Sequence, residues 1–291
     1  MNRSLEREEN FKKSMEELGV RSAGLSDTGL KREINEDYYE NDNSLGLYVV
    51  ADGMGGHLAG DVASKFAVNI IQQYFRQLRT ENTPLDELFG LPESSLSLWG
   101  NYVLASIKLA NRILYDMSQE YPRYKGMGTT IAVIALLNSA VIAANVGDSK
   151  IYLIRGDTIE PLSKSHTMMA EQLELGLISS EEAKTSPLRH IITRSLGSCS
   201  DVEVDVFEIE TMAGDSFLLC TDGLTDLVTD KDILNIIKSG DEQESICSKL
   251  VSEANNRGGI DNITVSFISL NGVLSRKKGI VGKFFQFFNR H

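Results

Sequence analysis

Hydrophobic and polar positions follow two different periods along this chain, which predicts a mixture of helices and strands. Apolar residues recur every three or four positions over 61–79 and 96–117, and this spacing predicts two consecutive long helices. Two further helices are predicted at 230–238 and 242–256. Short apolar runs bounded by turn residues predict strands. These runs are 20–27, 45–51, 128–135, 140–146, 150–155, 158–162, 215–220 and 263–270.

The order of these elements predicts an α+β fold. Two long helices in succession suggest an antiparallel helix pair packed on a sheet. The short strands between 128 and 162 are separated by tight turns, which is typical of an antiparallel meander. Residues 163–198 are expected to form an irregular, partly helical flap, and the polar stretch 32–37 is expected to be a loop.

Three segments are expected along the chain. Residues 1–20 carry many charges, with Phe11, Met15 and Leu18 at helical spacing, and predict an N-terminal helical extension. Residues 21–270 are expected to form one domain, because the candidate site residues described below come from both of its ends. Residues 271–291 form a basic, aromatic C-terminal tail.

Composition narrows the class of protein. The chain has 291 residues, 42% hydrophobic and 24% charged, which is typical of a soluble globular protein with a large core. Its net charge of −12 argues against nucleic acid as a partner. The three cysteines are widely spaced, no apolar run is long enough to span a bilayer, and the N-terminus has no apolar signal region. These features predict a cytoplasmic protein.

Four aspartates lie beside turns that adjoin strong strands, and they are the candidate metal ligands. They are Asp37, Asp52, Asp222 and Asp261. Hard divalent cations such as Mg²⁺ and Mn²⁺ prefer carboxylate oxygens and water. Two such ions about 4 Å apart can stabilise the attacking and leaving oxygens of an in-line displacement at phosphorus. Each aspartate alone is better explained as a turn or helix cap, whereas all four in matching settings favour a site.

Seven sequence blocks, in order, carry a resemblance to a known family. They are R-E-I-N-E-D, A-D-G-M-G-G-H, G-M-G-T-T, N-V-G-D-S, T-R-S-L-G, C-T-D-G-L-T-D and G-G-I-D-N with the I-T-V that follows. Between about residues 20 and 270 the chain resembles the bacterial metal-dependent Ser/Thr protein phosphatases of type 2C. The resemblance implies a β-sandwich of two antiparallel sheets flanked by antiparallel helix pairs, in α-β-β-α layers, with a two-metal centre at one end.

The resemblance also implies roles for individual residues. Asp52 would bridge both ions, with the Gly53 carbonyl on one of them; Asp37 would bind the second ion, and Asp222 and Asp261 would complete the first. Glu36 would hold a metal-bound water, and Arg32 would bind the phosphate. His57 falls where a general acid for the leaving oxygen has been proposed, although a turn histidine bound to backbone fits equally well. Asp148 is expected to order a turn near the metals.

The implied activity is the hydrolysis of phosphoserine and phosphothreonine in proteins, by a hydroxide that bridges two Mn²⁺ or Mg²⁺ ions. Its partners would be phosphorylated proteins, including Ser/Thr kinases and their substrates. A third ion is doubtful, because many bacterial members have an aspartate just before G-M-G-T-T and residues 121–125 here contain no acid. The flap entry, Ser165-His166, also departs from the usual Asp-His.

Other phosphatase and hydrolase classes fit less well. None of the cysteines is followed by arginine at C-x₅-R spacing, and neither a G-x-S-x-G elbow nor a phosphate-binding P-loop is present. A degenerate phosphatase domain that binds phosphoproteins without turnover is the main alternative, and a role in a partner-switching pathway is another. The intact set of aspartates favours an enzyme that opposes kinases.

The C-terminal tail carries a separate prediction. Five Lys/Arg residues and four phenylalanines lie within 276–291, without an acid. Basic and aromatic residues together favour docking on an anionic membrane surface or on a partner protein. The expected location is therefore cytoplasmic, and peripheral at the membrane if the tail docks there.

Overall fold

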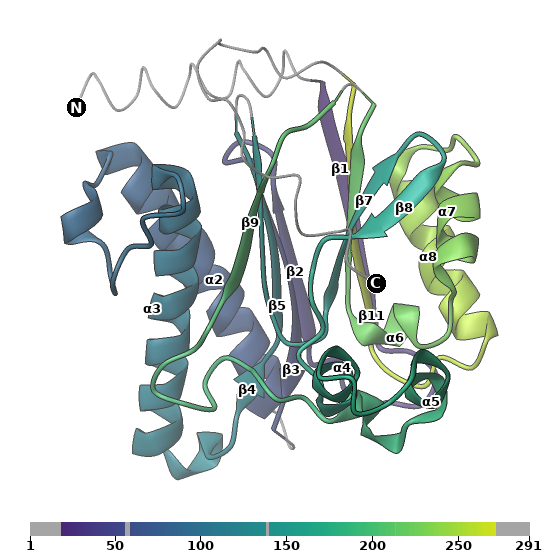
Figure 1. The fold of residues 1–291 in the computed structure, drawn as a ribbon, viewed down its shortest axis with the longest axis horizontal. Helices are drawn as coiled ribbons and strands as arrows, with labels where there is room; N and C mark the ends of the chain where they lie inside the picture. The colour runs from purple at the N-terminus through teal and green to yellow at the C-terminus, as the bar shows by residue number, and fades with distance from the viewer. Residues whose placement is uncertain (1–18, 56–58, 138–139, 213, 272–291) are drawn as a thin grey trace.

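Two antiparallel sheets form the centre of the molecule (Figure 1). The computed structural model describes residues 19–55, 59–137, 140–212 and 214–271. The first sheet has the order β1 (Val20–Asp27), β11 (Ile263–Leu270), β10 (Ser216–Cys220), β7 (Lys150–Arg155) and β8 (Thr158–Pro161). The second has the order β2 (Asp37–Asp42), β3 (Leu47–Met54), β5 (Ile131–Leu136), β6 (Val141–Val146) and β9 (Asp205–Ile209). The short strand β4 (Gly128–Thr129) pairs with the end of β3.

Helices cover the outer faces of both sheets. On one side α2 (Ala59–Glu81) and α3 (Leu98–Glu120) pack on the second sheet, and on the other α7 (Asp230–Ile237) and α8 (Gln243–Asn256) pack on the first (Figure 1). Shorter helices are η1 (Leu85–Glu87), η2 (Pro122–Tyr124), α4 (Met168–Glu174), α5 (Ser180–Thr185), η3 (Pro187–His190) and α6 (Asp222–Thr225). The predicted α-β-β-α layering is confirmed.

Strand β3 shows why the central strands read as continuous apolar runs. Leu47, Val49 and Ala51 pack in the layer beneath α2 and α3, whereas Tyr48 and Val50 pack between the two sheets. All five are fully buried, because the strand has an apolar layer on each face. The sheet therefore holds Asp52, which follows this run, on a rigid strand.

The structure corrects the prediction in two places. Residues 37–42 and 205–209 form strands β2 and β9, which the sequence analysis did not predict. Both lie at edges of the second sheet, and apart from the buried Asp37 their residues are only half buried. Charged residues interrupt the apolar ones in both strands, so no continuous apolar run marks them in the sequence. The expected single meander is also divided, because β5–β6 belong to the second sheet and β7–β8 to the first. The chain changes sheets at Gly147, whose positive φ of 101° favours glycine.

Some predictions fall outside the described residues. The N-terminal helix over Phe11, Met15 and Leu18, the tail 276–291 and His57 all lie there. Within the described part of the chain, none of the helices combines the length and the apolar character needed to cross a bilayer.

Candidate metal centre

The four aspartates come from both sheets and meet at one end of the sandwich. Asp37 is the first residue of β2 and lies directly opposite Asp52 on the neighbouring strand β3. Asp222 begins the short helix α6 just after β10, and Asp261 lies two residues before β11. Because β10 and β11 are neighbours in the first sheet, the two pairs face one another across the sandwich.

The electrostatics of these carboxylates show that they are close together and short of positive charge. Burial raises the pKa of Asp37 to about 7, and the nearby Asp261 and Glu36 add to the rise. Burial, together with the carboxylates around it, also raises the pKa values of Asp52 and Asp222 well above their ordinary range. Such a group of acids cannot all be ionised at neutral pH without a compensating cation.

Unsatisfied oxygens identify where a cation would bind. Oδ1 of Asp37, Oδ1 of Asp222 and Oε1 of Glu36 are buried and have no hydrogen-bond partner among the described residues. Buried polar atoms are nearly always hydrogen-bonded, so these oxygens need a ligand. Carboxylate oxygens without a competing thiolate fit a hard divalent cation.

Backbone contacts fix Asp52 and leave its carboxylate available. The Asp52 N–H donates to Oγ1 of Thr130 at 3.0 Å, and its carbonyl accepts from the Thr130 N–H at 2.8 Å and from Oγ1 of Thr129 at 2.9 Å. Oγ1 of Thr130 also lies 2.7 Å from Oγ of Ser149. The G-T-T and D-S blocks therefore hold the β3 end in position.

Gly53 and Gly60 bring α2 against the site. A Cβ at Gly53 would lie 2.2 Å from the Gly60 carbonyl oxygen and 2.5 Å from that of Glu36. A Cβ at Gly60 would lie 2.5 Å from Oε1 of Glu36. Glycine is therefore required at both positions, and the predicted site residue Glu36 is packed against the start of α2.

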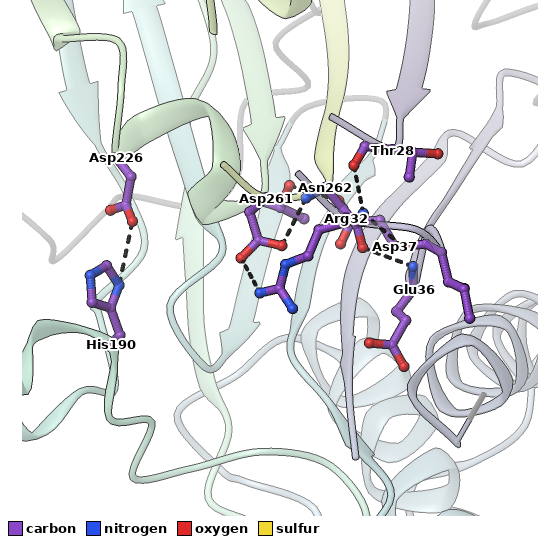
Figure 2. A network of polar contacts seen from close by, with 10 residues as sticks. Thr28, Arg32, Glu36, Asp37, His190, Asp226, Asp261 and Asn262 are labelled. Carbon is purple, nitrogen blue, oxygen red and sulfur yellow. Dashed lines mark hydrogen bonds and ion pairs between the residues drawn. The ribbon is translucent and has the colours of Figure 1, made fainter. Parts of the chain in front are cut away.

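Arg32 lies at the open edge of the acidic cluster. Its Nη2 donates to Oδ2 of Asp261 at 2.7 Å, and its side chain is 53% exposed (Figure 2). The hydrogen bond from Arg32 to Asp261 raises the pKa of the guanidinium. The remaining donors of this exposed cation can reach an incoming anion.

Asn262 ties the loop that carries Arg32 to the loop that carries Asp261. Its Nδ2 donates to the carbonyl oxygens of Thr28 and Ile34, each at 3.0 Å, and its Oδ1 accepts from the Glu36 N–H at 2.9 Å (Figure 2). The sequence analysis did not single out Asn262. Its place in the G-G-I-D-N block next to Asp261 is the signal that could have identified it.

Asp148, expected to order a turn near the metals, lies close to the candidate ligands Asp52 and Asp222. Its Oδ1 is buried and has no partner among the described residues, and burial raises the pKa of its carboxyl to about 6. His166 also holds this turn: its Nδ1 accepts from the Gly147 N–H at 3.0 Å, and its backbone N–H donates to the Gly147 carbonyl at 2.9 Å. Asp148 therefore belongs to the acidic cluster.

Asp226 and His190 also lie beside the cluster, and sequence reasoning missed both. Nδ1 of His190, at the end of η3 in the flap, is 3.4 Å from Oδ2 of Asp226 (Figure 2). One ligand atom each from His190, Asp222 and Asp226 lies within 4.8 Å of the others, so these three could hold a metal ion. The C-T-D-G-L-T-D block contains Asp226, whereas His190 had no signal in the sequence.

Comparison with known proteins places this chain and its fold in one family. The family model for protein phosphatase 2C matches residues 31–250. Protein phosphatase PhpP of Streptococcus pneumoniae serotype 2 is 35% identical over 250 residues, which cover 85% of this chain and 96% of the relative. Serine/threonine phosphatase stp of Listeria welshimeri is 35% identical over 249 residues, 84% of this chain and 94% of that protein.

Solved structures agree with the sequence relatives. The Mycobacterium tuberculosis serine/threonine phosphatase PstP/Ppp superposes with a TM-score of 0.75 at 31% identity, over 86% of this chain and 98% of that one. The catalytic domain of PstP in complex with two manganese ions has a TM-score of 0.71 at 31% identity, with the same coverage. The chain belongs to the protein phosphatase 2C family. This confirms the predicted resemblance, fold and class of enzyme, a Ser/Thr protein phosphatase, and it implies metal dependence.

Proposed function

We propose that Asp37, Asp52, Asp222, Asp261 and the Gly53 carbonyl hold two divalent cations, Mn²⁺ or Mg²⁺, within a catalytic domain of residues 21–270. The observation that carries the proposal is the cluster of buried carboxylates. Oδ1 of Asp37 and Oδ1 of Asp222 have no partner among the described residues, and burial raises the pKa values of Asp37, Asp52 and Asp222. The relative solved with two manganese ions supports two ions per site and supports Mn²⁺ as one of the candidate metals. A third ion is left out of the proposal, because residues 121–125 contain no acid.

The residues of this chain then act on the phosphate of a phosphoserine or phosphothreonine. When bound, the two ions supply charge that stabilises the transition state and lower the pKa of a water, which becomes the nucleophile. Arg32 orients the phosphate through its planar guanidinium and is itself positioned by Asp261. The unpartnered Oε1 of Glu36 accepts a hydrogen bond from the attacking water. His57 is proposed to donate a proton to the leaving oxygen.

The substrates are phosphorylated proteins, and the enzyme would oppose Ser/Thr kinases in signalling within the cytoplasm. The tail 276–291 is proposed to dock on an anionic membrane or on a partner, because basic residues flank four phenylalanines in it. Co-sedimentation with anionic liposomes, before and after deletion of 275–291, tests the membrane part. Equal binding by both proteins would refute it.

A degenerate phosphoprotein-binding module has no specific observation in its favour. All four aspartates are present, and the structure brings them together at one end of the sandwich. A binding module would not require the whole set.

The direct test is hydrolysis of p-nitrophenyl phosphate and a phosphothreonine peptide with Mn²⁺, Mg²⁺ or a chelator. Wild type is compared with Asp52→Asn and Asp222→Asn, and Asp116→Asn on the exposed surface of α3 is the control. Metal-dependent turnover in wild type and the control, lost in the two site variants, is the expected result. A folded wild type without turnover under any metal would favour the degenerate module.

A further inference from the structure

Three exposed hydrophobic residues lie close in the chain to Arg32 or to its partner Asp261. Leu30 is 64% exposed, Ile34 44% and Ile260 46%. Leu30 and Ile34 each lie two residues from Arg32, and Ile260 immediately precedes Asp261, which binds the Arg32 guanidinium. We call these three residues the apolar rim. Exposed hydrophobic residues that gather beside a functional group mark a surface used for binding.

The apolar rim is held rigidly. The Leu30 N–H donates to the Gly259 carbonyl at 2.8 Å, and a Cβ at Gly259 would lie 2.9 Å from Cγ of Leu30. The Leu30 side chain therefore lies against the loop that carries Ile260. The hydrogen bonds from Asn262 to the carbonyls of Thr28 and Ile34 also join the loop that carries Ile260 to the loop that carries Leu30 (Figure 2). A preorganised surface of this kind binds with little loss of conformational entropy.

The chemistry of the rim selects one kind of occupant. Arg32 places a half-exposed cation on the loop that also carries the exposed Leu30 and Ile34, and this arrangement complements an anion that has hydrophobic groups on either side. A chain with a net charge of −12 also disfavours strongly acidic peptides. A phosphorylated residue flanked by hydrophobic side chains fits both conditions.

We propose that the apolar rim binds hydrophobic side chains next to the phosphorylated serine or threonine of the substrate, so that the enzyme prefers phosphosites with hydrophobic neighbours. This inference rests on the proposed function, because it requires the phosphate to bind at Arg32. Leu30 and Ile260 are then specificity residues that contact the substrate away from the reacting phosphorus.

The experiment compares two phosphothreonine peptides with the full chain in Mn²⁺. They are identical except that the residues on both sides of the phosphothreonine are leucine in one and serine in the other. The variants are Leu30→Ser, Ile260→Ser and the double variant. The matched control is Leu91→Ser, a leucine that is 84% exposed and lies between η1 and α3. Hydrolysis of p-nitrophenyl phosphate, which has no flanking residues, reports the integrity of the metal centre.

Wild type and Leu91→Ser should show a kcat/KM about tenfold higher for the leucine peptide, as expected for burial of one or two aliphatic groups. The double variant should reduce this ratio to about one and retain its rate on p-nitrophenyl phosphate. A wild-type ratio near one, or a ratio that the double variant leaves unchanged, would overturn the inference. A wild type inactive on p-nitrophenyl phosphate would instead contradict the proposed function. A dimer seen by light scattering and lost in the double variant would show that a second copy covers the rim, and would also overturn the inference.

Discussion

Removal of the metals should make the stability of this protein depend on pH with an unusual sign. Asp37 is only 4% exposed, and burial raises its pKa from 3.8 to about 7, with Asp261 and Glu36 adding to the effect. The native state therefore binds a proton at Asp37 more tightly than the unfolded chain does. Between these two pKa values the native state holds more protons, so the contribution of Asp37 to the free energy of unfolding falls as pH rises from about 4 to 7 and levels off above 7.

The size of the effect follows from the difference in pKa. About three pKa units at about 1.4 kcal/mol each give roughly 4 kcal/mol over the whole range for Asp37 alone. Between pH 5 and pH 8, about 3 kcal/mol of this remains. The pKa values of Asp52 and Asp222 are raised in the same direction, so these groups add to the loss rather than cancel it.

Urea unfolding in a chelator at several values between pH 5 and pH 8 measures this dependence. Asp37→Asn should have a smaller slope and should be more stable than wild type at pH 8, because an amide has no ionised form to desolvate. Asp116→Asn, at an exposed position of α3, should keep the wild-type slope. Saturating Mn²⁺ should remove most of the dependence, because the cation compensates the ionised carboxylates. An unfolding free energy that stays constant or rises with pH in the chelator would refute the reasoning, as would an unchanged slope in Asp37→Asn.

Three other substitutions probe single contacts at the site. Arg32→Lys should lower kcat/KM for p-nitrophenyl phosphate by about ten- to a hundredfold, since an ammonium cannot replace the bidentate guanidinium; a rate within twofold of wild type would contradict this. Asn262→Ala should lower the free energy of unfolding, measured in urea, by about 2–3 kcal/mol, because two carbonyls and one N–H lose their partner. A loss below about 0.5 kcal/mol would show that water replaces the amide. Gly53→Ala should weaken Mn²⁺ binding measured by calorimetry at least tenfold, because its Cβ would lie 2.2 Å from the Gly60 carbonyl oxygen; wild-type affinity would show that α2 can move away.

Hydrophobic periodicity was sufficient for elements with an apolar face or two buried faces. The predicted strands at 20–27 and 263–270 agree with β1 and β11, and the predicted helix at 242–256 agrees with α8 to within one residue. Strands β2 and β9 could not be predicted this way. Charged residues interrupt the apolar ones in both strands, so neither strand has a continuous apolar run. Backbone hydrogen bonds to β3 and to β6 hold them in the sheet.

The site shows the same division between local and long-range information. Residue types and local turns, with the family resemblance, identified the aspartates Asp37, Asp52, Asp222 and Asp261 and also Arg32. The sequence did not reveal that Asp37 and Asp52 are opposed on neighbouring strands, that Asn262 joins two loops, or that His190 of the flap reaches Asp226.

The order of residues shows which segments are apolar enough to form the layers of the core and which carboxylates adjoin strand ends. Which sheet each strand joins, and which side chains meet, depends on the packed fold. The difference arises from distance along the chain. Periodicity reports the faces of one element, whereas the Arg32–Asp261 ion pair joins residues 229 positions apart and exists only after both sheets have packed together.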